Sequence, residues 1–125
     1  MHMQDIAGRA DIVWLVDNFY AKVREDALLA PVFNSRIQGH WDTHLDTMYK
    51  FWDMAIFGVR DYQGHPFAKH IQLPLQAEHF QRWLLHFNAT LDERFQGPVT
   101  EEVRLKARNI AKTFQVRMHI PLEGQ

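Results

Sequence analysis

The sequence predicts an all-α protein, and three observations carry that prediction. Apolar side chains recur at helical spacing through four long segments, almost no stretch alternates as a strand would, and glycine and proline fall between the segments. The chain has 125 residues, a length typical of one domain. We therefore expect residues 1–125 to form a single helical domain.

The first long helix is expected over residues 11–24. Its apolar side chains follow the i, i+3, i+4, i+7 spacing of one buried face: Ile12, Leu15, Val16, Phe19 and Val23. Tyr20 lies at the edge of that face. Pro31 then predicts a short helix or a tight bend within residues 28–33, and residues 34–39 are predicted to form a turn.

The second long helix is expected over residues 41–57, with Asp42 in its first turn. At 100° per residue, four side chains lie within about 40° of one another: His44, Met48, Phe51 and Ala55. His44 therefore faces inward, near the margin of the apolar stripe. An irregular connection is predicted over residues 58–66, and a short helical piece is possible over residues 67–71.

Two further helices are expected in the second half of the chain. The first covers residues 75–95, with a stripe formed by Phe80, Trp83, Leu84, Phe87 and Leu91. Gly97 and Pro98 end it. The last covers residues 101–118, with Thr100 as its expected N-cap, and buries Val103, Ala107, Ile110, Ala111 and Phe114.

Composition excludes several classes of protein. The chain has no cysteine, which rules out disulfides, thiolate catalysis and cysteine-ligated zinc or iron–sulfur sites. A single serine argues against a serine hydrolase. The net charge is −1 and the sequence has no block of like charge, so it offers no basic patch that would bind nucleic acid or an anionic membrane. Neither a signal segment nor a long apolar run is present, so we expect a cytoplasmic protein that does not enter a membrane.

The histidines and aromatic residues indicate a ligand. A content of eight histidines and 13% aromatic residues is typical of a protein with a cavity for a large flat molecule. His70 stands just ahead of Leu73 and Pro74, which must end any helix that carries it, so its ring can point sideways into a pocket. We interpret the pocket as a haem site with His70 bonded to the iron.

Other interpretations of these residues remain open. His40 and His44, four residues apart, share a helical face and could chelate zinc, although no carboxylate on that face completes the site. A haem leaves one axial position on each face of its ring, and the polar candidates for the second face are Tyr20, His44 and Trp83. Each of these three could equally be a core residue that bonds a backbone carbonyl.

Taken together, residues 18–34, 41–52 and 68–87 resemble the truncated haemoglobins, specifically group III. The resemblance is carried by Phe-Tyr in the first helix, Trp-x-x-His in the second, then His-x-x-Leu-Pro and Phe-x-x-Trp-Leu. The double-glycine motifs of the other truncated groups are missing, in agreement with group III. The resemblance implies a globin-like, truncated two-over-two helical sandwich that holds haem b.

The resemblance also implies residue roles. His70 matches the proximal iron ligand, while Tyr20, His44 and Trp83 match the distal residues that would contact the bound gas. Phe33 matches the phenylalanine that packs on the haem. Further side chains at positions resembling cavity-lining ones are Phe19, Phe51, Trp52, Phe67 and Phe80.

The implied function is the binding of O2, NO, CO or similar small ligands at an iron that is pentacoordinate or gated by His44. Two distal donors would retain O2, which favours O2/NO chemistry, as a nitric oxide dioxygenase or a peroxidase-like enzyme, over bulk oxygen transport. An electron-donating reductase would then be a partner. The alternatives are a haem-based gas sensor or interaction module, and a haem-free helical module that binds another flat ligand or a metal.

Overall fold

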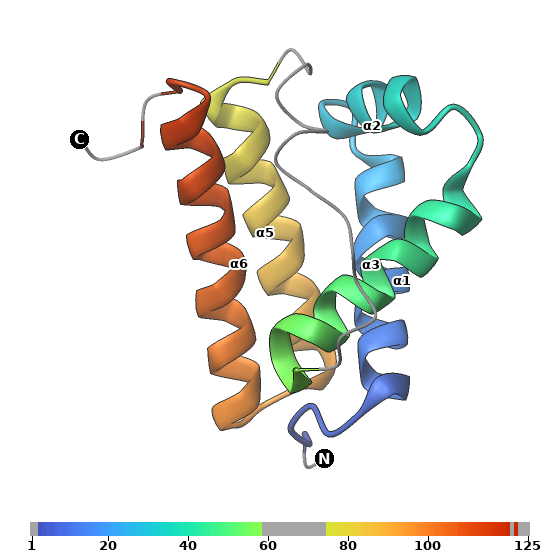
Figure 1. Cartoon of the computed structure of the whole chain (residues 1–125), viewed down its shortest axis with the longest axis vertical. Coiled ribbons are helices and arrows are strands. Elements are labelled where there is room, and N and C mark those ends of the chain that lie inside the picture. Colours follow the sequence, from blue (N-terminus) through green and yellow to red (C-terminus); the bar gives the residue numbers. More distant parts are fainter. Residues whose placement is uncertain (1–2, 59–74, 121, 123–125) are drawn as a thin grey trace.

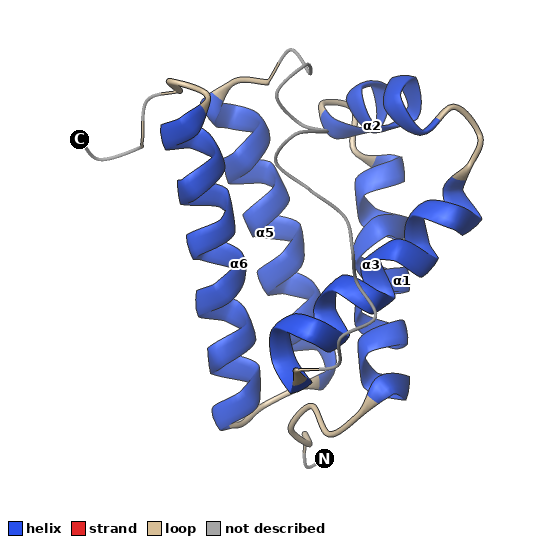
Figure 2. Cartoon of the chain, in the orientation of Figure 1, coloured by secondary structure: helices blue, strands red, loops and turns tan. Residues whose placement is uncertain are grey.

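The computed structural model describes residues 3–58, 75–120 and 122. The helices in these residues are α1 (Arg9–Glu25), α2 (Leu29–Ile37), α3 (Trp41–Phe57), α5 (Ala77–Arg94) and α6 (Pro98–Arg117). No strand appears in this part of the chain (Figure 2). The prediction of an all-α protein is therefore confirmed.

The helices pack as two pairs (Figure 1). α5 and α6 lie side by side and antiparallel, and α3 crosses α1 in the second pair. α1 joins the pairs because it also packs along α5, while α2 forms a short corner between α1 and α3. Asp53 of α3 is buried and forms an ion pair with Arg9 at the start of α1, which ties these two helices together.

The core lies where α1 meets α5. All five apolar side chains predicted for the face of α1 are at most 2% exposed: Ile12, Leu15, Val16, Phe19 and Val23. Phe19 meets Phe87 of α5 edge to face, with ring centroids 5.3 Å apart. Burial of a large apolar side chain contributes roughly 1.5–3 kcal/mol, so this contact is a main source of stability between the two pairs.

The prediction of a turn over residues 34–39 is wrong for its first part, because α2 continues to Ile37. Gln38 then adopts a left-handed conformation (φ 53°), and its N–H donates to the Asn34 carbonyl. The Asn34 side chain does not form a local turn. It accepts a hydrogen bond from the Trp41 indole N–H at 3.1 Å, across the corner to α3.

The start of α6 also differs from the prediction, because Thr100 is not its N-cap. Gly97 occupies that position and Pro98 opens the helix. The capping carboxylate is that of Asp5, which accepts from the Val99 and Thr100 amides at 2.8 and 2.7 Å and from the Thr100 hydroxyl at 2.7 Å. Gly97 has a φ of 147°, and a Cβ there would lie 2.5 Å from the Asp5 side chain, so glycine is required.

Among the described residues, no helix combines the length and apolar character that crossing a membrane demands.

Removing the Asp5 carboxylate should destabilise the fold in a pH-dependent way. Burial alone would raise the pKa of Asp5, but its hydrogen bonds to Thr100, Val99 and Ile6 lower that pKa below the ordinary value. A lowered folded-state pKa stabilises the protein above the unfolded pKa of about 3.9, and the contribution disappears as pH falls through the folded pKa. We expect Asp5→Ala to lower the free energy of unfolding by about 1–2 kcal/mol at neutral pH.

The measurement is urea unfolding of wild type and variant at pH 7 and under acid conditions. Asp46→Ala is the matched control, because Asp46 is an exposed carboxylate that pairs with Lys50 one turn away on the same helix. Equal losses for the two variants at pH 7 would contradict the capping role of Asp5.

Candidate functional site

A cavity of about 460 Å³ lies between the two helix pairs. This volume falls within the range of roughly 300–1,000 Å³ that small-molecule and cofactor sites occupy. The described residues that line it are Tyr20, Leu29, Val32, Phe33, Arg36, Ile37, His40, Thr43, His44, Thr47, Met48, Phe51, Trp52, Leu75, His79, Phe80, Trp83, Ile110, Ala111 and Phe114. The wall is mostly apolar, and these residues include no carboxylate.

Three polar side chains predicted from the sequence meet at this cavity, although each comes from a different helix. Tyr20 belongs to α1, His44 to α3 and Trp83 to α5. The rings of Tyr20 and His44 are nearly perpendicular, with centroids 4.9 Å apart. Trp83 stacks on Phe87, with centroids 5.5 Å apart and planes 13° apart. The structure therefore gathers an O–H, an imidazole and an indole N–H around one apolar space.

Burial keeps the Tyr20 hydroxyl protonated. Tyr20 is 5% exposed, and this burial raises its pKa well above the usual value for tyrosine. A phenol that does not ionise near neutral pH is a permanent hydrogen-bond donor. Helix periodicity explains why Tyr20 faces inward: it lies one turn after Val16, on the edge of the buried face of α1.

The corner before α3 positions His44. Trp41 is buried at the start of α3, where Asn34 accepts its indole N–H and the Arg24 guanidinium lies 4.6 Å from its ring. Trp41 in turn meets His44 edge to face, with centroids 5.7 Å apart. These contacts hold the first turn of α3, which carries His44, against α1 and α2.

The remaining predicted site residues divide into three groups. Phe33, Phe51, Trp52 and Phe80 line the cavity. Phe19 is 2% exposed and packs behind the wall, edge to face with Tyr20 at 4.8 Å and with Trp83 at 5.4 Å. His70 and Phe67 lie outside the described residues, so their assigned roles stay predictions.

Several lining residues were not identified from the sequence as residues of a haem site. Arg36, His40 and Thr43 are exposed and form a polar rim at the α2–α3 corner. His79 lies at the start of α5, where its Nδ1 accepts the Gln76 N–H at 2.9 Å. The i, i+3, i+4 pattern of α6 identified Ile110, Ala111 and Phe114 as buried, but no sequence signal separates a cavity wall from a solid core.

The zinc interpretation of His40 and His44 gains no support. Within residues 3–58 and 75–120, no group of three or more histidine, aspartate or glutamate side chains could hold a metal ion. The cavity instead combines apolar and aromatic walls with hydrogen-bond donors inside and the Arg36 guanidinium at its rim. That set suits a large flat molecule that is apolar at its centre and anionic at one edge.

Comparison with known proteins gives the class of protein. Residues 3–119 match the model of the bacterial-like globin family, and the chain belongs to that family. It is 34% identical over 112 residues to the group 3 truncated haemoglobin Ctb of Campylobacter jejuni, which covers 86% of this chain and 88% of the relative. A crystal structure of a group III truncated haemoglobin from Campylobacter jejuni superposes with a TM-score of 0.87 at 30% identity, over 94% of this chain and 95% of the other.

The chain is thus a group III truncated haemoglobin, as the sequence motifs indicated, and its helices form the truncated globin fold. Membership of the globin family makes it a haem protein whose ligands are small gases such as O2.

Proposed function

We propose that this globin holds haem b in the cavity with His70 as the iron ligand and uses the bound gas for O2/NO chemistry rather than for bulk oxygen transport. The observation that carries the proposal is the convergence of Tyr20, His44 and Trp83 at one apolar cavity. Donors brought together from three helices favour retention of a polar ligand. A carrier must instead release its ligand readily.

The residues of the cavity fit a haem. Bound haem supplies an iron that takes up O2, NO and CO reversibly. Phe33, Phe51 and Phe80 offer apolar surface to the ring. At the exposed rim, the Arg36 guanidinium and the His40 ring are suited to the two carboxylates of the haem, because a guanidinium pairs well with a carboxylate. The absence of carboxylates from the described wall avoids repulsion of that anionic edge.

Tyr20 and Trp83 are the proposed donors to the bound gas. Bound O2 carries partial negative charge on its outer atom, and a hydrogen bond to it contributes roughly 0.5–1.5 kcal/mol net. Two such bonds slow the loss of O2 on the order of 5- to 150-fold. Because burial keeps the pKa of Tyr20 high, its O–H remains available for this role at neutral pH.

His44 is proposed as a gate. It is half-buried, directly follows the exposed Thr43, and sits where the rim meets the buried wall. A ring at that boundary can turn between the pocket and solvent, and so admit or exclude a ligand. Repeated turnover of O2 with NO, or of peroxide, requires electrons, so an electron-donating reductase completes the proposal.

Loss of either distal donor should speed the release of O2. We expect Tyr20→Phe and Trp83→Phe each to raise the O2 dissociation rate by roughly 2- to 12-fold, and the double variant to raise it further. Stopped-flow replacement of O2 by CO measures these rates. Tyr49→Phe and Trp14→Phe are matched controls, because Tyr49 bonds Asp17 and Trp14 packs on Phe95, away from the cavity.

Unchanged O2 dissociation in both cavity variants would show that the donors do not contact the gas. A similar increase in the controls would show that the rate reports a general loosening of the fold.

The oxygenated protein should consume NO much faster than it autoxidises. Retained and polarised O2 is poised to react with NO, so we expect loss of NO within the mixing time of a stopped-flow experiment, with nitrate as the product. An NO electrode and nitrate analysis provide the measurement. NO consumption no faster than autoxidation would remove nitric oxide dioxygenase from the proposal and leave haem binding intact.

A further inference from the structure

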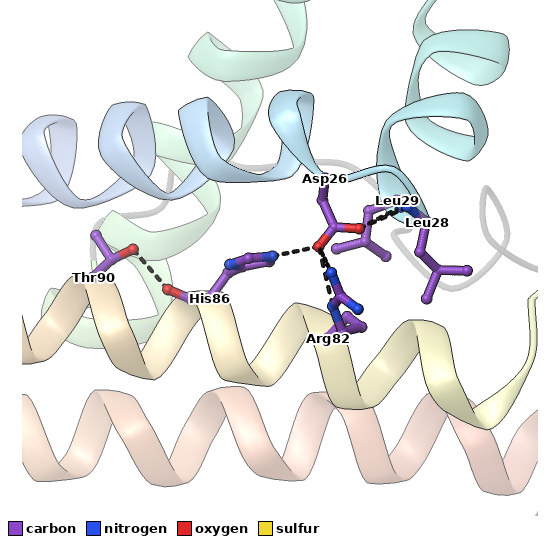
Figure 3. Close-up of polar contacts among 6 residues, drawn as sticks. All are labelled: Asp26, Leu28, Leu29, Arg82, His86 and Thr90. Atoms are coloured by element: carbon purple, nitrogen blue, oxygen red, sulfur yellow. Dashed lines mark hydrogen bonds and ion pairs between the residues drawn. The ribbon is translucent and has the colours of Figure 1, made fainter.

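The buried carboxylate of Asp26 joins α1, α2 and α5 (Figure 3), and its hydrogen-bond partner Leu29 lines the cavity. The Asp26 side chain is 1% exposed. Its Oδ1 accepts the Leu28 and Leu29 amides at 2.7 and 3.1 Å. Its Oδ2 accepts Nη2 and Nε of Arg82 at 2.7 and 3.1 Å and lies 2.6 Å from Nε2 of His86. Asp26 therefore meets five donor groups.

These contacts keep the carboxylate ionised. Burial by itself would raise the pKa of Asp26, but hydrogen bonds from His86, the Leu28 and Leu29 amides and Arg82 lower it well below the usual range. A buried charge with partners on every side is held firmly, because moving any partner away leaves the charge unsatisfied in a poorly solvated place. Asp26 and its partners Leu28, Leu29, Arg82 and His86 therefore form a rigid joint between α1, α2 and α5.

The three helices in this joint carry the residues assigned to the gas site. Asp26 directly follows α1, which bears Tyr20, and its two amide partners begin α2, which bears Phe33. Its side-chain partners Arg82 and His86 lie one turn apart on α5. Trp83 is the residue next to Arg82.

Helix geometry explains why this joint matters for Trp83. Arg82 and His86 lie about 40° apart around α5, and Trp83 lies roughly 60–100° further round, on the side of the cavity. A side chain about 5–6 Å from the helix axis moves roughly 2 Å when the helix turns by about 20°. Hydrogen bonds of this kind tolerate only a few tenths of an ångström. The rotation of α5 therefore decides where the indole N–H points.

We propose that Asp26 is a positioning residue for the distal pocket. By clamping Arg82 and His86 it sets the rotation of α5, and so the aim of the Trp83 N–H relative to Tyr20. The inference rests on the proposed role of Trp83 as a donor to the bound gas.

The test replaces the carboxylate with an amide in the haem-loaded protein. Asp26→Asn keeps an oxygen for the Leu28 and Leu29 amides, but its NH2 group cannot accept from Arg82 or His86. We expect O2 dissociation to speed up several-fold, and the C–O stretching frequency of the CO complex to shift toward that of Trp83→Phe. Arg82→Met, which removes one half-buried partner, should give the same change to a smaller degree.

A double-variant cycle separates positioning from general stability. If Asp26 acts through Trp83, then Asp26→Asn should change O2 dissociation by less than about twofold in the Trp83→Phe background. Its loss of thermal stability should persist in that background. Asp92→Asn is the control, because Asp92 is an exposed α5 carboxylate that pairs with Arg104 and lies outside the cavity. It should leave both the rate and the frequency unchanged.

Two results would overturn the inference while leaving the proposed function in place. One is a wild-type rate and C–O frequency in both Asp26→Asn and Arg82→Met, whatever the change in melting temperature. The other is an effect of Asp26→Asn that is just as large without Trp83. A wild-type protein that shows no Soret band after haem is added would overturn the proposed function and the inference together.

Discussion

The structure depends on packing that stabilises the domain while leaving a cavity of about 460 Å³ within it. Aromatic contacts meet both requirements, a stable core and an open cavity. Phe87 stacks on Trp52 at 5.1 Å and on Trp83 at 5.5 Å, and meets Phe19 edge to face. These rings connect α1, α3 and α5, and two of them, Trp52 and Trp83, also line the cavity. Aromatic pairs add roughly 0.5–1.5 kcal/mol each beyond their buried area, which helps to offset the destabilising effect of the open space.

Three carboxylates connect the helices to one another through hydrogen bonds and ion pairs. Asp5 caps α6, Asp26 joins α1, α2 and α5, and Asp53 ties α3 to the start of α1. Hydrogen-bonded charges are specific about geometry, because they cost free energy whenever a partner is missing. The hydrophobic effect, by contrast, is non-directional. The ionic contacts thus fix the angles of the helices, and the angles fix where Tyr20 and Trp83 point.

How much the sequence predicts depends on the distance along the chain between partners. The buried face of α1 was predicted correctly because helical periodicity alone determines it, and Tyr20 follows from the same pattern. The Asp5 cap on Thr100 and the Asp26 contact with Arg82 join residues 95 and 56 positions apart, so no local pattern reveals them. α2 was predicted too short for a different reason: Asn34 was interpreted as a turn residue, whereas its side chain bonds Trp41, seven positions further on at the start of α3. Tyr20, His44 and Trp83 were grouped as polar side chains within apolar stripes, the family resemblance pointed to the same three, and the structure places all of them at one cavity.

The central proposal is that this cavity would hold haem, with His70 as the iron ligand and with Tyr20 and Trp83 as donors to the gas that the haem would bind. The absorption spectrum of the ferrous protein, reconstituted with haem as wild type, His70→Ala and His44→Ala, tests it directly. The account predicts a Soret band and histidine ligation in wild type and in His44→Ala, and loss of haem or of histidine ligation in His70→Ala. Intact ligation in His70→Ala together with its loss in His44→Ala would contradict the account, because it would place the iron ligand on the wall that carries Tyr20 and Trp83.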